Sequence, residues 1–165
     1  MTEFIKFFFL LLAAISFASV KNHRDFISPN RMTKAIVYNF PEKETTLESR
    51  IRIMNINGKV LFETSFTSKD GQHGFGVTQA QWTTDSRFFV FGMHSSGGHQ
   101  PWHILTFAYS VKLNKLISID KLVEPVISRF KLFSPDSIEA EGFKSDLDHP
   151  DKFGVRLSKL IHRHK

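Results

Sequence analysis

Short apolar runs separated by turn residues follow one another along the chain from Arg31 onward. The runs are rich in β-branched and aromatic residues, and each is bounded by Gly, Pro, Asn, Asp or Ser. This pattern is typical of strands, because a helix of ordinary length needs a longer run with a period near 3.6. The strands that it predicts cover residues 35–40, 51–56, 60–66, 87–93 and 103–111.

Alternation within the runs supports this interpretation. In the second run Ile51 and Ile53 share one face and Arg52 lies on the other, as in a half-buried strand. One segment, residues 116–126, has apolar residues at helical spacing, but it contains an aspartate and a proline and is predicted to be strand plus loop. The sequence therefore predicts an all-β fold built as an antiparallel β-meander, with a β-sandwich as the alternative.

Turn residues indicate how the strands are connected. Asn57-Gly58 lies between two predicted strands and favours a type I′ hairpin, in which both central residues have positive φ. Ser68 to Gly71 predicts the next turn. Residues 82–109 read as a hairpin with a long Gly-, Ser- and His-rich connection from Met93 to His103.

A four-residue pattern begins at Ile27, Trp82 and Phe133. Each copy has a large apolar residue, a hydroxyl residue, Pro or Thr, and Asn or Asp. The apolar residue would enter the core, and the hydroxyl and carboxyl or amide groups would bond backbone groups to close a tight turn. The pattern indicates either a repeated unit or a chance recurrence, and in both cases Trp82 is predicted to be a core residue.

Residues 80–91, which read AQWTTDSRFFVF, resemble the blade-opening motif of TolB-type β-propellers, commonly Trp-Ser-Pro-Asp-Gly-Arg followed by an apolar strand. Residues 133–137 resemble it again, whereas Thr84 and Ser86 depart from the usual Pro and Gly. The loop from Ser96 to Trp102 is similar to one in small exported bacterial proteins of uncharacterised function. In the propeller family these motif residues are structural, so the resemblance implies blade-like units and carries over no catalytic residue.

The chain length limits what these units can build. A propeller needs about four or more blades to close, and the sequence holds about two to three blade-like units, so we expect them not to form a closed propeller. An open sheet leaves edge strands that a protein must cover or use for pairing. The sequence therefore predicts strand-edge contacts with a partner or a homo-oligomer that forms through sheet edges.

The first twenty residues have the pattern of a signal peptide. Lys6 precedes a short apolar run from Phe7 to Ile15, and Ser16 and Ala18 supply the small residues of a cleavage site. The prediction is a signal peptide over residues 1–18, with an uncleaved anchor helix as the alternative, and a single β-sheet domain over residues 19–165. The protein is expected to be exported, either periplasmic or secreted, with no membrane span in the mature chain.

Composition and charge narrow the function classes. The chain has no cysteine, so its core depends on packing, and phenylalanine is the obvious filler, with 18 in the full chain, three of them in the signal run from Phe7 to Phe9. A net charge of +6 favours anionic surfaces. The basic residues are scattered except at the tail from Lys159 to Lys165, so no specific nucleic-acid partner is predicted.

The loop from Met93 to His103 is the predicted binding site, because binding residues often lie on loops carried by a rigid sheet. The predicted contacts are His94, Ser96, Gly97, Gly98, His99, Gln100, Trp102 and His103. The expected partner is a protein or a cell-envelope component, bound without catalytic residues or a cofactor.

The alternative is a metal-dependent enzyme in which loop histidines hold a divalent metal, since neutral imidazole is a common metal ligand. Its ligands would be His73, His94, His99 and His103. The spacing matches no established motif, and the sequence offers the loop histidines no neighbouring carboxylate that could orient their rings.

Overall fold

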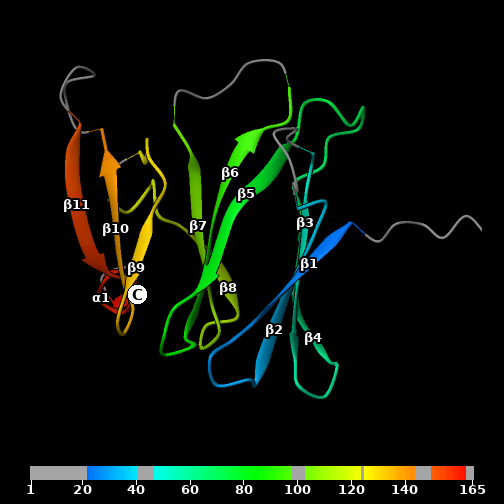
Figure 1. Cartoon of the computed structure of the whole chain (residues 1–165), viewed down its shortest axis with the longest axis horizontal. Helices are drawn as coiled ribbons and strands as arrows, with labels where there is room; N and C mark the ends of the chain where they lie inside the picture. Colours follow the sequence, from blue (N-terminus) through cyan, green and yellow to red (C-terminus); the bar gives the residue numbers. More distant parts are fainter. Residues whose placement is uncertain (1–21, 41–46, 98–102, 124, 144–149, 163–165) are drawn as a thin grey trace, which may run out of the picture.

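The computed structural model describes residues 22–40, 47–97, 103–123, 125–143 and 150–162. The predicted signal peptide lies outside these residues. In the described residues the chain forms eleven strands and one short helix, and the strands make three antiparallel sheets (Figure 1).

Each sheet is a meander of consecutive strands. The first sheet contains β1 (His23–Ile27), β2 (Thr33–Tyr38), β3 (Arg50–Asn55) and β4 (Val60–Ser65). The central sheet contains β5 (Phe75–Trp82), β6 (Phe88–Ser95), β7 (Leu105–Ser110) and β8 (Lys115–Ser118). The third sheet contains β9 (Lys131–Phe133), β10 (Ser137–Gly142) and β11 (Asp151–Arg156), and the helix α1 (Leu157–His162) follows it.

This architecture confirms the prediction of an all-β antiparallel meander of blade-like units. Figure 1 shows the three sheets side by side, with the central sheet between the other two. A β-sandwich would have two layers. The part of the chain that the structure describes forms three layers and closes no barrel.

The central sheet is buried on both faces. Phe89 and Phe91 belong to a core cluster shared with Val37 and Ile53 of the first sheet. Phe88 and Val90, which point the opposite way, belong to a second cluster that includes Ile138 of the third sheet and Leu157 of α1. A strand that is buried on both faces reads as a continuous apolar run, which explains the unbroken run in β6.

The outward faces of the stack carry charges. On the first sheet the Nζ of Lys34 lies 3.0 Å from an Asp25 carboxylate oxygen, and Arg52 Nη2 lies 2.9 Å from Glu63 Oε1. On the third sheet charged side chains line a groove; they include Lys131, Glu139 and Lys152. Because water can cover both outward faces, the three sheets need no further sheet to shield them.

The repeated four-residue pattern lies at the same place in each sheet, between its first and second strands. In the first copy Ser28 Oγ donates to Asn30 Oδ1 (2.8 Å), and Thr33 N donates to Ser28 Oγ (3.1 Å). In the second copy Thr83 Oγ1 donates to Asp85 Oδ1 (2.8 Å), and Phe88 N donates to Thr83 Oγ1 (3.1 Å). The matching bonds show that the first two copies close their turns in the same way.

The turns also connect neighbouring sheets. Asn30 N donates to Ser86 Oγ (3.0 Å), and Ser86 has a φ of 63°, the left-handed conformation for which a glycine is usual. Thr84 Oγ1 donates to the Pro135 carbonyl (3.1 Å), and the Arg87 guanidinium lies 3.3 Å from an Asp136 oxygen. The first copy of the turn therefore contacts the second, and the second contacts the third.

The hairpin at Asn57-Gly58 forms between β3 and β4, but the type I′ prediction is wrong. Positive φ occurs at Gly58 (80°) and not at Asn57. The Asn55 side chain accepts hydrogen bonds from the backbone N–H of Asn57 (3.0 Å) and Lys59 (2.9 Å). These bonds favour a longer turn, accompanied by a register shift between Ile53 and Met54.

Six elements were absent from the sequence prediction, namely β1, β5, β9, β10, β11 and α1. The helix forms because Leu157 and Leu160 are buried on the third sheet, while Ser158 N donates to an Asp136 oxygen (2.9 Å). The segment at 116–126 is confirmed as strand plus loop. Over the described residues, no helix has the length and apolar character that a bilayer crossing requires.

Candidate functional site

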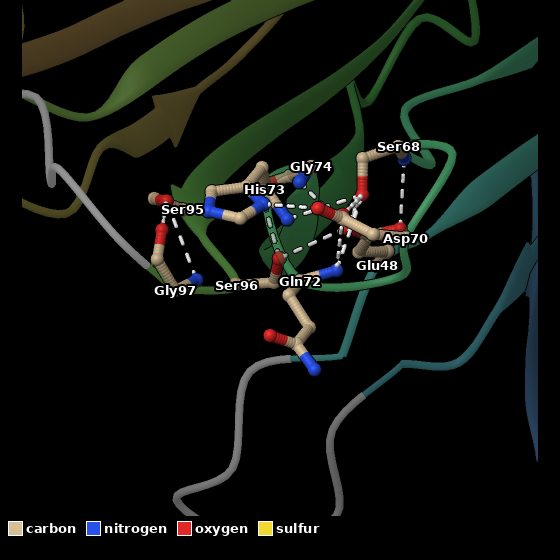
Figure 2. A network of polar contacts seen from close by, with 9 residues as sticks. All are labelled: Glu48, Ser68, Asp70, Gln72, His73, Gly74, Ser95, Ser96 and Gly97. Carbon is tan, nitrogen blue, oxygen red and sulfur yellow. Dashed lines mark hydrogen bonds and ion pairs between the residues drawn. The ribbon is translucent and has the colours of Figure 1, made fainter.

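Three segments meet at one end of the first and central sheets: residues 47–49, the β4–β5 loop at 66–74 and the end of β6 at 95–97. Ser49 N donates to the Phe75 carbonyl (2.9 Å), and Phe66 N donates to the Ser49 carbonyl (2.9 Å). Ser96 N donates to the Gly74 carbonyl (2.9 Å). These bonds bring residues that are distant in sequence into one polar network, which we call the Glu48 network (Figure 2).

The carboxylate of Glu48 lies at the centre of this network and is buried. It accepts hydrogen bonds from Ser68 N (2.8 Å), Gly74 N (2.6 Å), Ser96 Oγ (3.2 Å) and the Ser68 hydroxyl. A buried charge is tolerated only when it is well hydrogen-bonded. Mainly because of the Ser68 hydroxyl, the pKa of Glu48 is lowered, and the carboxylate stays ionised while it connects the three segments.

Two glycines are required for the close packing around the carboxylate. A Cβ at Gly74 would lie 2.3 Å from the Phe66 carbonyl oxygen and 2.7 Å from Glu48 Oε1. A Cβ at Gly97 would lie 2.7 Å from the Gln72 carbonyl oxygen. Gly97 was predicted as a binding residue. In the structure its lack of a side chain allows the end of β6 to approach the β4–β5 loop closely.

An imidazole and a carboxylate lie on the exposed side of the network. His73 Nδ1 is 2.5 Å from Asp70 Oδ2, and the His73 side chain is 63% exposed. Asp70 also accepts from Gln72 N (3.0 Å), and its Oδ1 lies 2.8 Å from Ser68 Oγ, whose one proton is shared with Glu48. These contacts, led by the one from Gln72, hold the pKa of Asp70 well below its usual value. The sequence had suggested no carboxylate partner for the histidines, and for His73 the structure corrects this.

The other predicted site residues lie in different surroundings. Ser96 is in the Glu48 network, whereas His94 pairs with Gly76 and lies on the face of β6 toward the third sheet. Burial and the nearby Arg129 lower the pKa of His94. His103 is half-buried near Asp120, whose pKa burial raises. Outside the described residues lie Gly98, His99, Gln100 and Trp102.

The geometry of the described residues does not test the predicted four-histidine metal site. Within the described ranges, no three His, Asp or Glu side chains gather closely enough to hold a metal ion. This applies to His73, His94 and His103, but His99 lies outside those ranges. The four-histidine site therefore stays a prediction, and elemental analysis of the purified protein tests it.

Glu48 was not among the residues predicted from the sequence. It lies in a polar connection and belongs to no motif. Its donors are 20, 26 and 48 positions away along the chain. The only sequence signals near these donors were the turn at Ser68 to Gly71 and the glycines at 74 and 97.

We expect Glu48→Gln to reduce the fall in melting temperature that the protein shows as the pH is lowered from neutral. The folded-state pKa of Glu48 lies below its usual 4.5, so the carboxylate stabilises the fold above that pH and this stabilisation is lost as pH falls through the folded-state pKa. Between neutral pH and about pH 3 the melting temperature of the wild type should therefore fall more than that of the variant. Differential scanning fluorimetry across this range measures the difference.

The control for this experiment is Glu139→Gln, the same change on β10 of the third sheet. The melting temperature of this variant should change with pH as that of the wild type does. A Glu48→Gln profile parallel to that of the wild type would contradict the role assigned to the carboxylate.

The comparisons with known proteins concern the fold. No family model matches the chain, and no curated protein matches it. A solved structure from Clostridium novyi NT, provisionally described as a conserved lipoprotein, superposes with a TM-score of 0.50 and 12% sequence identity, over 81% of this chain and 85% of that one. At this identity the likeness shows a shared fold.

Structures of puromycin hydrolase, one of them an S511A mutant complexed with PGG, also align. The TM-score is 0.34 and the identity 7%, over 82% of this chain and 27% of the hydrolase. The chain thus spans about a quarter of the hydrolase. The fold of this chain is similar to that of the Clostridium protein over most of the length of each.

Proposed function

We propose that this protein is an exported, non-enzymatic β-domain that binds a protein or cell-envelope partner through the loop end that contains the Glu48 network. The observation that carries the proposal is the convergence of three segments on one buried carboxylate. Loops that are held on a rigid sheet are well suited to binding. The ordering cost of binding is lower because the contact residues are already fixed.

Several groups of this end are available to a partner. His73 and Gln72 are exposed, and Figure 2 shows the Gln72 side chain pointing away from the network. The loop that begins at Ser96 continues to Trp102, one of the contacts predicted from the sequence. The end therefore offers hydrogen-bonding groups and an imidazole on a fixed support.

Export is the second part of the proposal. Residues 1–18 have the charge, apolar run and small-residue site of a signal peptide, and the provisional description of the Clostridium protein as a lipoprotein agrees with export. Cell fractionation tests this part. The full chain should be recovered outside the cytoplasm, whereas a Leu11→Arg variant with an interrupted apolar run should remain inside.

Binding is tested with isolated cell envelopes in a sedimentation assay. We expect Trp102→Ala and His73→Ala each to weaken binding about five-fold or more, the size typical of a central interface residue. Pretreating the envelopes with protease distinguishes a protein partner from an envelope polymer. The control is Lys131→Ala on the third sheet, which should bind like the wild type. Unchanged binding by both loop variants would contradict the proposal.

A further inference from the structure

The end of the molecule opposite the Glu48 network carries exposed aliphatic side chains. Figure 1 shows the β1–β2, β3–β4 and β7–β8 turns together at this lower end. Ile27, Met32 and Ile56 are 63%, 56% and 62% exposed, and Val60 is 43% exposed. Ile56 N donates to the Met32 carbonyl (2.9 Å), so the tips of the first two turns are adjacent. Exposed apolar groups that cluster in this way mark an interaction surface.

The charged residues around this cluster are basic. A groove of about 250 Å³ lies between the two turns; Ile27, Met54 and Ile56 form its apolar walls, and the charged residues lining it are Arg31 and Lys34. None of the described residues that line the groove is acidic, but Lys34 is paired with Asp25 (3.0 Å), so Arg31 supplies the positive charge of the rim. The cluster therefore combines an apolar surface with a cationic rim.

Neighbouring turns extend the positive charge. Lys59 follows the β3–β4 tip, and Lys112 and Lys115 belong to or follow the β7–β8 turn; all three are exposed. The acidic residues of the described turns at this end, Asp85 and Asp136, lie 2.6 Å and 3.3 Å from the Arg87 guanidinium. Arg87 offsets one of these two negative charges, so the excess of cations at this end depends on Arg31 and the exposed lysines.

We propose that the lower end of the stack docks on an anionic lipid surface. Aliphatic side chains at hairpin tips can enter the interface between headgroups and acyl chains, and each nearby lysine or arginine is attracted to anionic headgroups. The hydrophobic groups lie at hairpin turns and at the strand ends beside them, next to a groove, and such a set of short turns can enter a deformable surface. Charge complementarity selects anionic over zwitterionic lipid. This inference does not depend on the proposed function of the loop end.

The absence of cysteine allows a direct test. Asn57→Cys, at the β3–β4 tip, is labelled with an environment-sensitive fluorophore in the full chain. Vesicles of phosphatidylcholine with about 30% phosphatidylglycerol should increase and blue-shift the emission, and vesicles of phosphatidylcholine alone should not. The matched control is Lys69→Cys in the β4–β5 loop at the other end, where the label should not respond. The apolar segment 7–15 is common to both proteins, so it cannot produce a difference between the two labels.

Second substitutions in the labelled chain identify the groups involved. Lys59→Gln and Lys112→Gln should each weaken vesicle binding about five-fold, and Lys69→Gln should have no effect. Ile56→Asn together with Met32→Asn should abolish the shift. Trp102→Ala and His73→Ala should leave it intact, which separates this inference from the function of the loop end.

Three results would overturn the inference. The first is an equal response with both kinds of vesicle, or at both label positions. The second is a response to polyglutamate as strong as that to anionic vesicles, which would assign the surface to an acidic protein. The third is a dimer in light scattering that dissociates on Ile56→Asn, which would assign the surface to a second copy of the chain.

Discussion

Trp82→Ala should lower the free energy of unfolding by about 3–5 kcal/mol, the cost expected for deleting a large buried aromatic side chain. Trp82 is 5% exposed and its ring centroid lies 5.2 Å from that of Phe89. The indole also connects two sheets, because its Nε1 donates to the Phe26 carbonyl of β1 (2.8 Å). The substitution therefore removes packing and an inter-sheet hydrogen bond together. Urea unfolding followed by circular dichroism measures the loss.

Trp82→Phe separates these two contributions. It keeps an aromatic ring in the core but leaves the Phe26 carbonyl without its indole donor, which should cost about 1–3 kcal/mol for the unpaired group. The unfolding free energy of this variant should lie between those of the wild type and Trp82→Ala. An unaltered unfolding midpoint for Trp82→Ala would mean that the residue is not part of the core.

Phe88→Ala and Phe89→Ala should each cost about 3–5 kcal/mol, although the two residues are adjacent and point in opposite directions. Phe89 is fully buried against the first sheet, and Phe88 is 3% exposed in the cluster shared with the third sheet. In a two-layered structure one residue of such a pair faces solvent and its removal costs little. The pair therefore tests the three-layered arrangement directly.

Phe133→Ala is the matched control, because this phenylalanine is 49% exposed on β9. It should change the unfolding free energy by no more than about 0.5 kcal/mol. If either Phe88→Ala or Phe89→Ala behaved like this control, one face of the central sheet would be open to water.

Much of the fold was predictable because strands and turns depend on neighbouring residues. The alternation in β3, the continuous apolar run in β6 and the turn chemistry after Trp82 are all local signals. They were sufficient for the fold class and for the burial of Trp82. The failure at Asn57-Gly58 was also local, because the Asn55 side chain selects a longer turn.

The remaining features depend on contacts between distant parts of the chain. β1 is stabilised by pairing with β2, although its own sequence, HRDFI, has weak apolar alternation. α1 forms where two leucines meet the third sheet. Of the candidate site, Ser96 and Gly97 were predicted as binding residues from their loop, whereas Glu48 acquires its importance only when Ser68, Gly74 and Ser96 reach it. No pattern of neighbouring residues indicates these long-range contacts.

The charged outward faces have one further consequence. Sheets that stack face to face can in principle add further units without limit, as copies of a chain do in a fibre. The ion pairs of Lys34 and Arg52 on the first sheet, and the charges of Lys131 and Glu139 on the third, would have to lose their water for another copy to stack there. The protein therefore resists polymerisation through the two faces that its geometry leaves open.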